Sequence, residues 1–118
     1  MSSNDLPVIV YKILAYIYES MKAGVEPTAQ EARRLCACND MMFESAIAEI
    51  AEAGYARGIR AEFYYSGPEV SFERARLTLD GSDYLLNNST MAKAKAAAGG
   101  LFQSVLSQTV QAAFTAMQ

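Results

Sequence analysis

Residues 54–85 read GYARGIRAEFYYSGPEVSFERARLTLDGSDYL, and the pattern of this stretch decides the fold class. A run rich in β-branched and aromatic residues extends from Ile59 to Tyr65, and a second apolar run extends from Val70 to Leu77. The four residues between them, Ser-Gly-Pro-Glu at 66–69, are typical turn formers. The sequence therefore predicts an antiparallel β-hairpin within Arg57–Leu77.

Helices are predicted on both sides of this hairpin. Before it, apolar residues at three- and four-residue spacing predict a first helix that ends near Ala23, where Gly24 can adopt the left-handed C-cap conformation. After it, Thr78 is the expected N-cap of a helix that ends near Asn88, and Ser89 is the expected N-cap of the last helix.

Two more helices are predicted between the first helix and the hairpin. Thr28 is the N-cap candidate of a short helix over Ala29–Cys36, and a third helix runs from the N-cap candidate Asn39 to Gly54. Only Ala37–Asn39 connect the two. A short helix joined to a longer one by so tight a connection is typical of a helix-turn-helix.

The order of elements predicts an α+β fold that is mostly α. We expect a winged helix-turn-helix domain over residues 5–88, with the two-stranded hairpin as its wing, and a C-terminal helical extension over 89–118 that is broken at Gly99-Gly100. The extension carries one apolar stripe, which can fold back on the first helix or pair with another chain. We expect homodimerisation through its residues Leu101, Phe102, Val105, Leu106, Val110, Phe114 and Met117.

Composition narrows the class of protein. The chain has 118 residues, 52% of them hydrophobic, and a formal net charge of −3, which fits one globular domain. No apolar run approaches the roughly 20 residues of a membrane span, and no basic stretch leads into an apolar signal segment, so we expect a cytoplasmic protein that is not bound to a membrane. With no histidine, no P-loop and no G-x-S-x-G or G-x-G-x-x-G motif, we expect neither an enzyme nor a cofactor.

The two cysteines do not predict a metal site. Cys36 and Cys38 form a lone C-x-C, which cannot supply the four ligands of a structural zinc site. A disulfide between them would close a strained loop. We expect two small, partly buried thiols at a helix end.

The closing half of the domain resembles a known family. This half contains Gly54-Tyr55, then a hairpin, and then Leu77-Thr78-Leu79-Asp80-Gly81-Ser82-Asp83-Tyr84-Leu85. It is similar to the G-Y-I … L-T-x-x-G-x-x-Y-L pattern of many winged helices. With Ile13–Glu19 and Asn88–Met91, the chain most resembles the YjcQ family, small winged-helix proteins of bacteria and often of their phages. The resemblance covers roughly Asp5 to Lys95. It implies the winged-helix fold, for which DNA binding is usually inferred.

The candidate DNA-contacting residues lie on the second helix, the third helix and the wing. The third helix is where a winged helix places base contacts, yet from Asn39 to Gly54 it carries four acidic residues and no basic one. Its candidate face includes Met42 and Ser45, whereas the cations available for phosphates are Arg33, Arg34, Arg57, Arg60, Arg74 and Arg76. The alternative for the wing arginines is pairing with neighbouring glutamates across the ribbon.

Two functional hypotheses stay open at this point. The first is a DNA-binding transcriptional regulator that contacts double-stranded DNA as a dimer. The second is a winged-helix module that binds protein and not DNA, with the acidic third helix as part of its surface.

Overall fold

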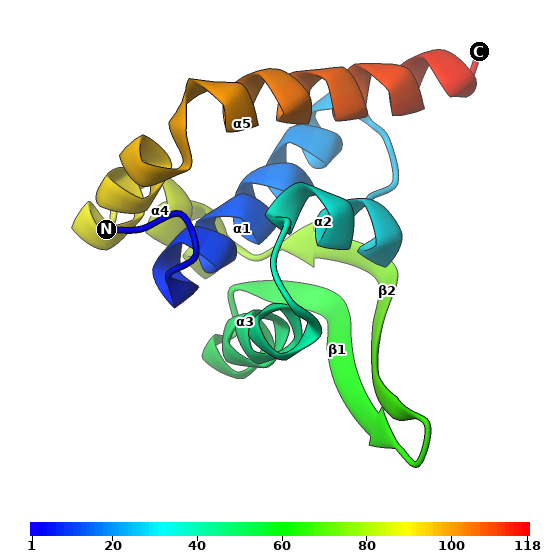
Figure 1. Cartoon of the computed structure of the whole chain (residues 1–118). Helices are drawn as coiled ribbons and strands as arrows, with labels where there is room; N and C mark the ends of the chain where they lie inside the picture. Colours follow the sequence, from blue (N-terminus) through cyan, green and yellow to red (C-terminus); the bar gives the residue numbers. More distant parts are fainter.

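The computed structural model covers residues 1–118 and has a winged-helix arrangement with a long C-terminal helix (Figure 1). The elements are α1 (Leu6–Ala23), α2 (Ala29–Cys36), α3 (Asp40–Ala53), β1 (Ala56–Tyr64), β2 (Gly67–Leu77), α4 (Leu79–Asn87) and α5 (Ser89–Ala116). The predicted order of helix, helix, turn, helix, hairpin and helix is confirmed. The fold is therefore α+β and mostly helical.

Helix α1 is the centre of the core. Its fully buried side chains include Ile9, Ile13, Leu14 and Ile17. The helix packs against the four other helices and β2, with α5 on one side and α3 with the ribbon on the other (Figure 1). Burial of this apolar surface is the main favourable term in folding. The four other helices and β2 are therefore held in place by packing on α1.

The α2–α3 corner is held by local backbone geometry. The Thr28 hydroxyl accepts from the Glu31 N–H at 3.2 Å, and the Asn39 side chain accepts from the Met42 N–H at 2.9 Å, so both helices begin at capped termini. Between the helices, Ala37 adopts a left-handed conformation with φ of 50°. A residue with a Cβ resists this conformation, at a cost of about 1 kcal/mol. The corner is tight because Ala37 accepts that strain.

The wing is a two-stranded antiparallel ribbon that starts earlier and turns more tightly than predicted. Tyr64 pairs with Gly67, so the connection is Tyr65-Ser66, whereas turn formers at 66–69 predicted a longer one. Pro68 lies inside β2 opposite Phe63. Near the base a bulge interrupts the register at Gly58, where a Cβ would overlap the carbonyl oxygen of Glu73. A bulge of this kind bends the strand and increases its local twist.

Helix α5 begins one residue earlier than the cap prediction implies. The cap is Asn88, whose side-chain oxygen accepts from the N–H groups of Thr90 and Met91, and Ser89 is the first helical residue. The predicted break is present, because Gly99 has a φ of 84° and a ψ of 172° inside α5. No helix, α5 included, combines the length and the apolar character needed to cross a membrane.

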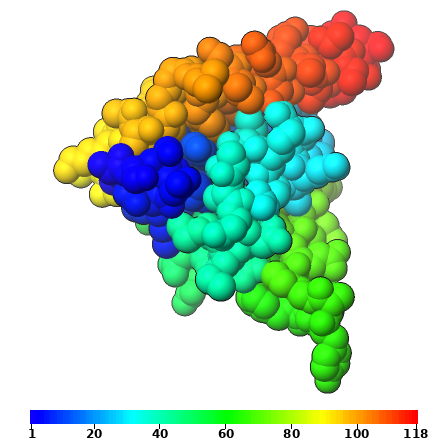
Figure 2. Space-filling view, viewed as in Figure 1, coloured from blue at the N-terminus to red at the C-terminus, as the bar shows by residue number.

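The apolar stripe of α5 folds back on its own chain over most of its length. Phe102, Leu106 and Val110 are buried, and the Phe102 ring meets the Tyr11 ring edge-on at 5.9 Å. A 2.7 Å hydrogen bond from the Gln103 amide to the Tyr11 hydroxyl fixes the contact. Towards its C-terminus α5 extends past the rest of the body and ends in a projecting segment, as does the wing tip (Figure 2).

A close backbone approach joins the base of the wing to α4. Thr78 donates its N–H to the Tyr55 carbonyl and its hydroxyl to the Gly54 carbonyl, at 3.1 and 2.6 Å. The Tyr55 and Tyr84 rings stack 4.3 Å apart. Gly81 lies against the Tyr55 carbonyl, and a Cβ there would overlap the carbonyl oxygen. The G-Y and L-T-x-x-G-x-x-Y segments of the sequence are therefore two halves of one junction.

Replacing Gly81 by alanine tests this junction. The added methyl group would push α4 away from the Tyr55 backbone, so we expect the free energy of unfolding to fall by about 2–3 kcal/mol in urea titrations. Gly100→Ala is the matched control, because a Cβ there has no neighbour within 4 Å and should change stability by less than about 1 kcal/mol. Equal stabilities of the two variants would contradict the junction.

Candidate functional site

The outer face of α3 is acidic. Asp40, Glu49 and Glu52 are exposed, and the helix has no lysine or arginine. The predicted base-reading residues Met42 and Ser45 are half-buried, with Met42 packed against the core. Attraction to phosphates supplies most non-specific DNA affinity. Because all charged side chains of α3 are negative, the approach of this helix to a duplex is disfavoured.

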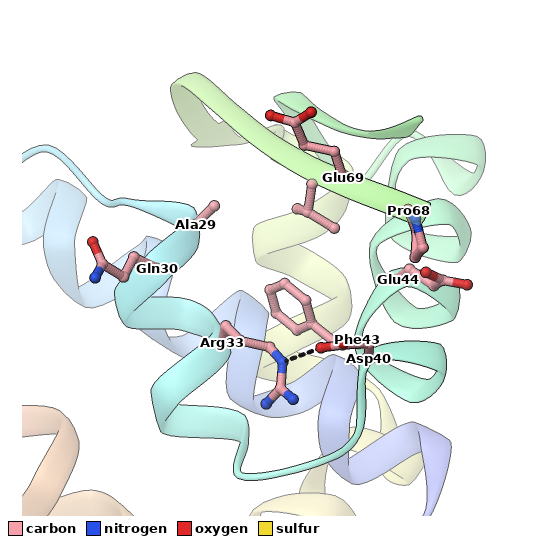
Figure 3. A pocket seen from close by; sticks show the side chains of 9 residues that line it. Ala29, Gln30, Arg33, Asp40, Phe43, Glu44, Pro68 and Glu69 are labelled. Carbon is pink, nitrogen blue, oxygen red and sulfur yellow. Dashed lines mark hydrogen bonds and ion pairs between the residues drawn. The ribbon is translucent and has the colours of Figure 1, made fainter. Parts of the chain in front are cut away.

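A groove lies between α2, the start of α3 and the wing (Figure 3). It has a volume of about 460 Å³. Its lining residues are Ala29, Gln30, Arg33, Asp40, Phe43, Glu44, Pro68, Glu69 and Val70. The Arg33 Nε donates to Asp40 at 3.0 Å, and the guanidinium lies 5.9 Å from the centre of the Phe43 ring. Since Asp40 offsets the only cation, the groove keeps a negative charge from Glu44 and from Glu69 at its rim.

Glu44 has an unsatisfied carboxylate oxygen. Its Oε2 is inaccessible to solvent, and no donor lies within hydrogen-bonding distance. Buried polar atoms in native proteins are nearly always paired, and an unpaired carboxylate oxygen costs more than a neutral one. Glu44 therefore carries an unmet hydrogen-bonding demand at the wall of the groove.

The wing tip is aromatic and exposed, which the sequence interpretation missed. Phe63, Tyr64 and Tyr65 are 72%, 53% and 112% exposed, although aromatic residues on a half-buried hairpin usually pack. The reason is length: the ribbon passes beyond the last half-buried pair, Ala61 opposite Val70, before it turns. The Tyr64 hydroxyl donates to Glu62, whose carboxylate raises the pKa of that tyrosine.

Four of the six candidate arginines are engaged in ion pairs. Arg60 contacts Glu62 at 2.8 Å and, across the ribbon, Glu73 at 3.7 Å, as the pairing alternative predicts. Arg33 contacts Asp40, as described above. The other two pair outside the ribbon: Arg34 contacts Glu31 and the Thr109 hydroxyl of α5, and Arg76 makes two 2.8 Å bonds to Glu26. The Arg76 guanidinium lowers the pKa of Glu26.

Arg57 and Arg74 are the two wing arginines without an ion pair. Both are exposed, on opposite strands at the bulge near the base of the ribbon. Arg74 has a left-handed φ of 57°, a strained conformation for a residue with a side chain. They lie at the end of the wing that is far from its aromatic tip. The cationic and aromatic groups of the wing therefore occupy different ends.

The seven predicted dimerisation residues fall into two sets. Phe102, Leu106 and Val110 are buried within the chain and Val105 is half-buried. The exposed members are Leu101 at 78%, Phe114 at 39% and Met117 at 61%. Phe114 and Met117 belong to the segment that projects past the body. Their side chains are exposed there.

The helix-turn-helix, the bent two-stranded wing and the supporting α1 define an α+β winged-helix protein. A family model described as YjcQ protein matches residues 11–99, and the chain belongs to this family. No curated protein and no solved structure matches the chain. The family membership and the fold are thus established, and the site must be interpreted from its own chemistry.

Proposed function

We propose that this protein is a non-catalytic winged-helix module that binds a protein partner through the face formed by α3, the groove and the wing tip. The observation that carries the proposal is the groove itself, whose only cation is already paired and whose Glu44 has a buried, unsatisfied oxygen. Such a groove favours a cationic side chain with an apolar stem, as in lysine or arginine.

Net charge supports a basic partner. Residues 5–88 contain all thirteen acidic residues and eight of the ten basic ones. The tail contains only Lys93 and Lys95. A negative surface speeds association with a positive partner and repels a nucleic acid. The negative surface of the winged-helix domain therefore disfavours the approach of a DNA duplex over much of its area.

The aromatic tip supports a protein partner as well. Exposed Phe63, Tyr64 and Tyr65 offer large, rigid contact area next to the groove, since Glu69 lines the groove and also flanks the tip. Tyrosine is enriched at energetically important positions of protein interfaces. Arginine side chains also stack on such rings. Groove and tip together therefore form one surface for a segment that carries arginine.

A labelled octa-arginine peptide tests the proposed surface. We expect Glu44→Gln, which keeps the size of the side chain and removes its charge, to weaken binding about tenfold, since hydrogen bonds between charged groups contribute about 1.5–3 kcal/mol. The control Glu52→Gln removes the same charge from α3 outside the groove, and we expect less than a twofold change. Fluorescence anisotropy measures both. Equal losses in the two variants would show attraction to net charge alone and contradict the groove.

DNA binding is the second candidate function, and the unpaired Arg57 and Arg74 are the observation that favours it. In this arrangement the base of the wing would lie along the phosphates of the DNA, and α3 would not contact the bases. The protein would then act as a regulator whose specificity comes from elements other than its third helix.

A titration with random duplex DNA at low and at physiological salt tests this candidate. We expect Arg57→Ala/Arg74→Ala to weaken binding and to reduce the salt slope by about 2, because two phosphate contacts are lost. The matched control Lys93→Ala/Lys95→Ala removes the same charge from the tail and should leave the slope unchanged. Absence of binding by the unaltered protein at low salt would exclude the DNA-binding function.

We also propose that the projecting end of α5 pairs with the same segment of a second copy. Residues 96–118 have no charged side chain, and Phe114 and Met117 extend the buried stripe past the point where α1 and α2 can cover it. Two such neutral, apolar helix ends can pack against each other without burying a charge.

Sedimentation analysis tests this pairing. The unaltered chain is expected to sediment as a dimer, and Phe114→Gln/Met117→Gln as a monomer. Leu101→Gln is the control, because Leu101 is exposed on the same helix but far from its end, and should remain dimeric. A monomeric unaltered chain would refute the proposal. Truncation at Ala98 is unsuitable, because it removes Phe102 and Leu106 from the core.

A further inference from the structure

The α2–α3 corner holds two thiols on either side of a strained residue. Cys36 ends α2 and is 2% exposed, Cys38 is half-buried, and the two are free. Ala37 between them has the left-handed φ of 50°. Both cysteines pack on the same hydrophobic core, so the corner turns both side chains inward. They are close enough that each thiol perturbs the pKa of the other.

An unpaired cation lies beneath this corner. Lys12 of α1 is 8% exposed, forms no ion pair with any carboxylate, and holds its ammonium 5.5 Å from the centre of the Phe102 ring. A buried ammonium without an anionic partner is costly, and cation–π attraction offsets the cost only in part. Cys38 lies within the field of Lys12 and can become the missing anion.

The charged groups around Cys38 act in one direction. The neighbouring Cys36 thiol has the largest effect, and Arg33 from α2 and Lys12 from α1 add positive charge; against the opposing effect of burial, these groups together lower the pKa of Cys38 to about 7. Asp40, the first residue of α3, has its carboxylate held by Arg33 at 3.0 Å. The interaction with Cys38 and burial raise the pKa of Cys36, and the positive charges of Lys12 and Arg33 oppose this rise only in part. One thiol is thus prepared to ionise and the other to stay protonated.

We propose that Cys36 and Cys38 form a peroxide-reactive dithiol, in which Cys38 is the nucleophile and Cys36 the resolving thiol. The Cys38 thiolate attacks one oxygen of the peroxide, the O–O bond breaks, and the second oxygen leaves with a proton as water. Cys38 is now a sulfenic acid. The Cys36 sulfur then attacks the Cys38 sulfur and displaces its hydroxyl group, which leaves as water with the Cys36 proton. The thiols lose two electrons and the peroxide gains them.

The product changes the corner that positions α3. A disulfide across one intervening residue is strained, and strained disulfides are the easily reduced, regulatory ones. It would fix the chain from Cys36 to Cys38, which lies between the two partners of the Arg33–Asp40 ion pair at the groove. The dithiol chemistry is independent of any partner, so its test and the tests of the proposed function fail separately.

Intact mass spectrometry of the full chain after treatment with hydrogen peroxide tests the dithiol. We expect the mass to fall by two hydrogen atoms, without dimer formation, and dithiothreitol to restore it. Cys36→Ser should stop at the sulfenic acid, which dimedone traps. Cys38→Ser should remain unmodified under the same conditions. An unchanged mass of the unaltered chain, or oxidation of Cys38→Ser as fast as that of Cys36→Ser, would overturn the assignment.

Alkylation of Cys38 by iodoacetamide across a pH series tests the role of Lys12. We expect Lys12→Met to slow alkylation at neutral pH about fivefold, because less thiolate is present, and to move the midpoint of the pH profile upward. Lys12→Arg keeps the charge and should keep the rate. Circular dichroism confirms that each variant is folded. Equal rates in Lys12→Met and Lys12→Arg would contradict the cationic activation of Cys38.

Discussion

The close approach of α4 to the Tyr55 carbonyl is the constraint on which the rest of the structure depends. Gly81 permits it, Thr78 fixes it with two hydrogen bonds, and the stacked rings of Tyr55 and Tyr84 cover it. The junction brings the two ends of the ribbon together at the C-terminus of α3. This contact between backbones fixes the base of the wing next to α3 and α4.

Charge pairing decides what the wing face can bind. The ribbon carries four arginines and three glutamates. The geometry neutralises Arg60 on the wing and uses Arg76 to tie the wing to Glu26. On this face, the charged groups without an ion-pair partner are arginines at the base of the wing and carboxylates in the groove. The tip of the wing is aromatic. Exposed ion pairs contribute little stability, since water screens them. Their larger effect here is to remove cations from the surface that would meet a partner.

The helix-turn-helix corner combines strain and burial in a few residues. Ala37 in a left-handed conformation keeps α2 and α3 close, and the same turn places two cysteines over α1. Lys12 occupies a buried position of α1 at which helical periodicity favours an apolar residue. Conflicts between local preference and the global fold are often found at functional sites. The corner and the Glu44 oxygen are the two clearest conflicts in this chain.

The sequence by itself determined the elements, their order and the winged-helix fold, because caps, glycine C-caps and apolar periodicity act within a few residues. It placed the α2–α3 corner and the break at Gly99, but not the turn at Tyr65-Ser66 or the Asn88 cap, where neighbouring residues compete for the same role. Only the tertiary structure decided which arginines are paired, that Glu44 is unsatisfied and that Lys12 is buried. Those properties depend on residues far apart in the chain, whose distances no local pattern encodes.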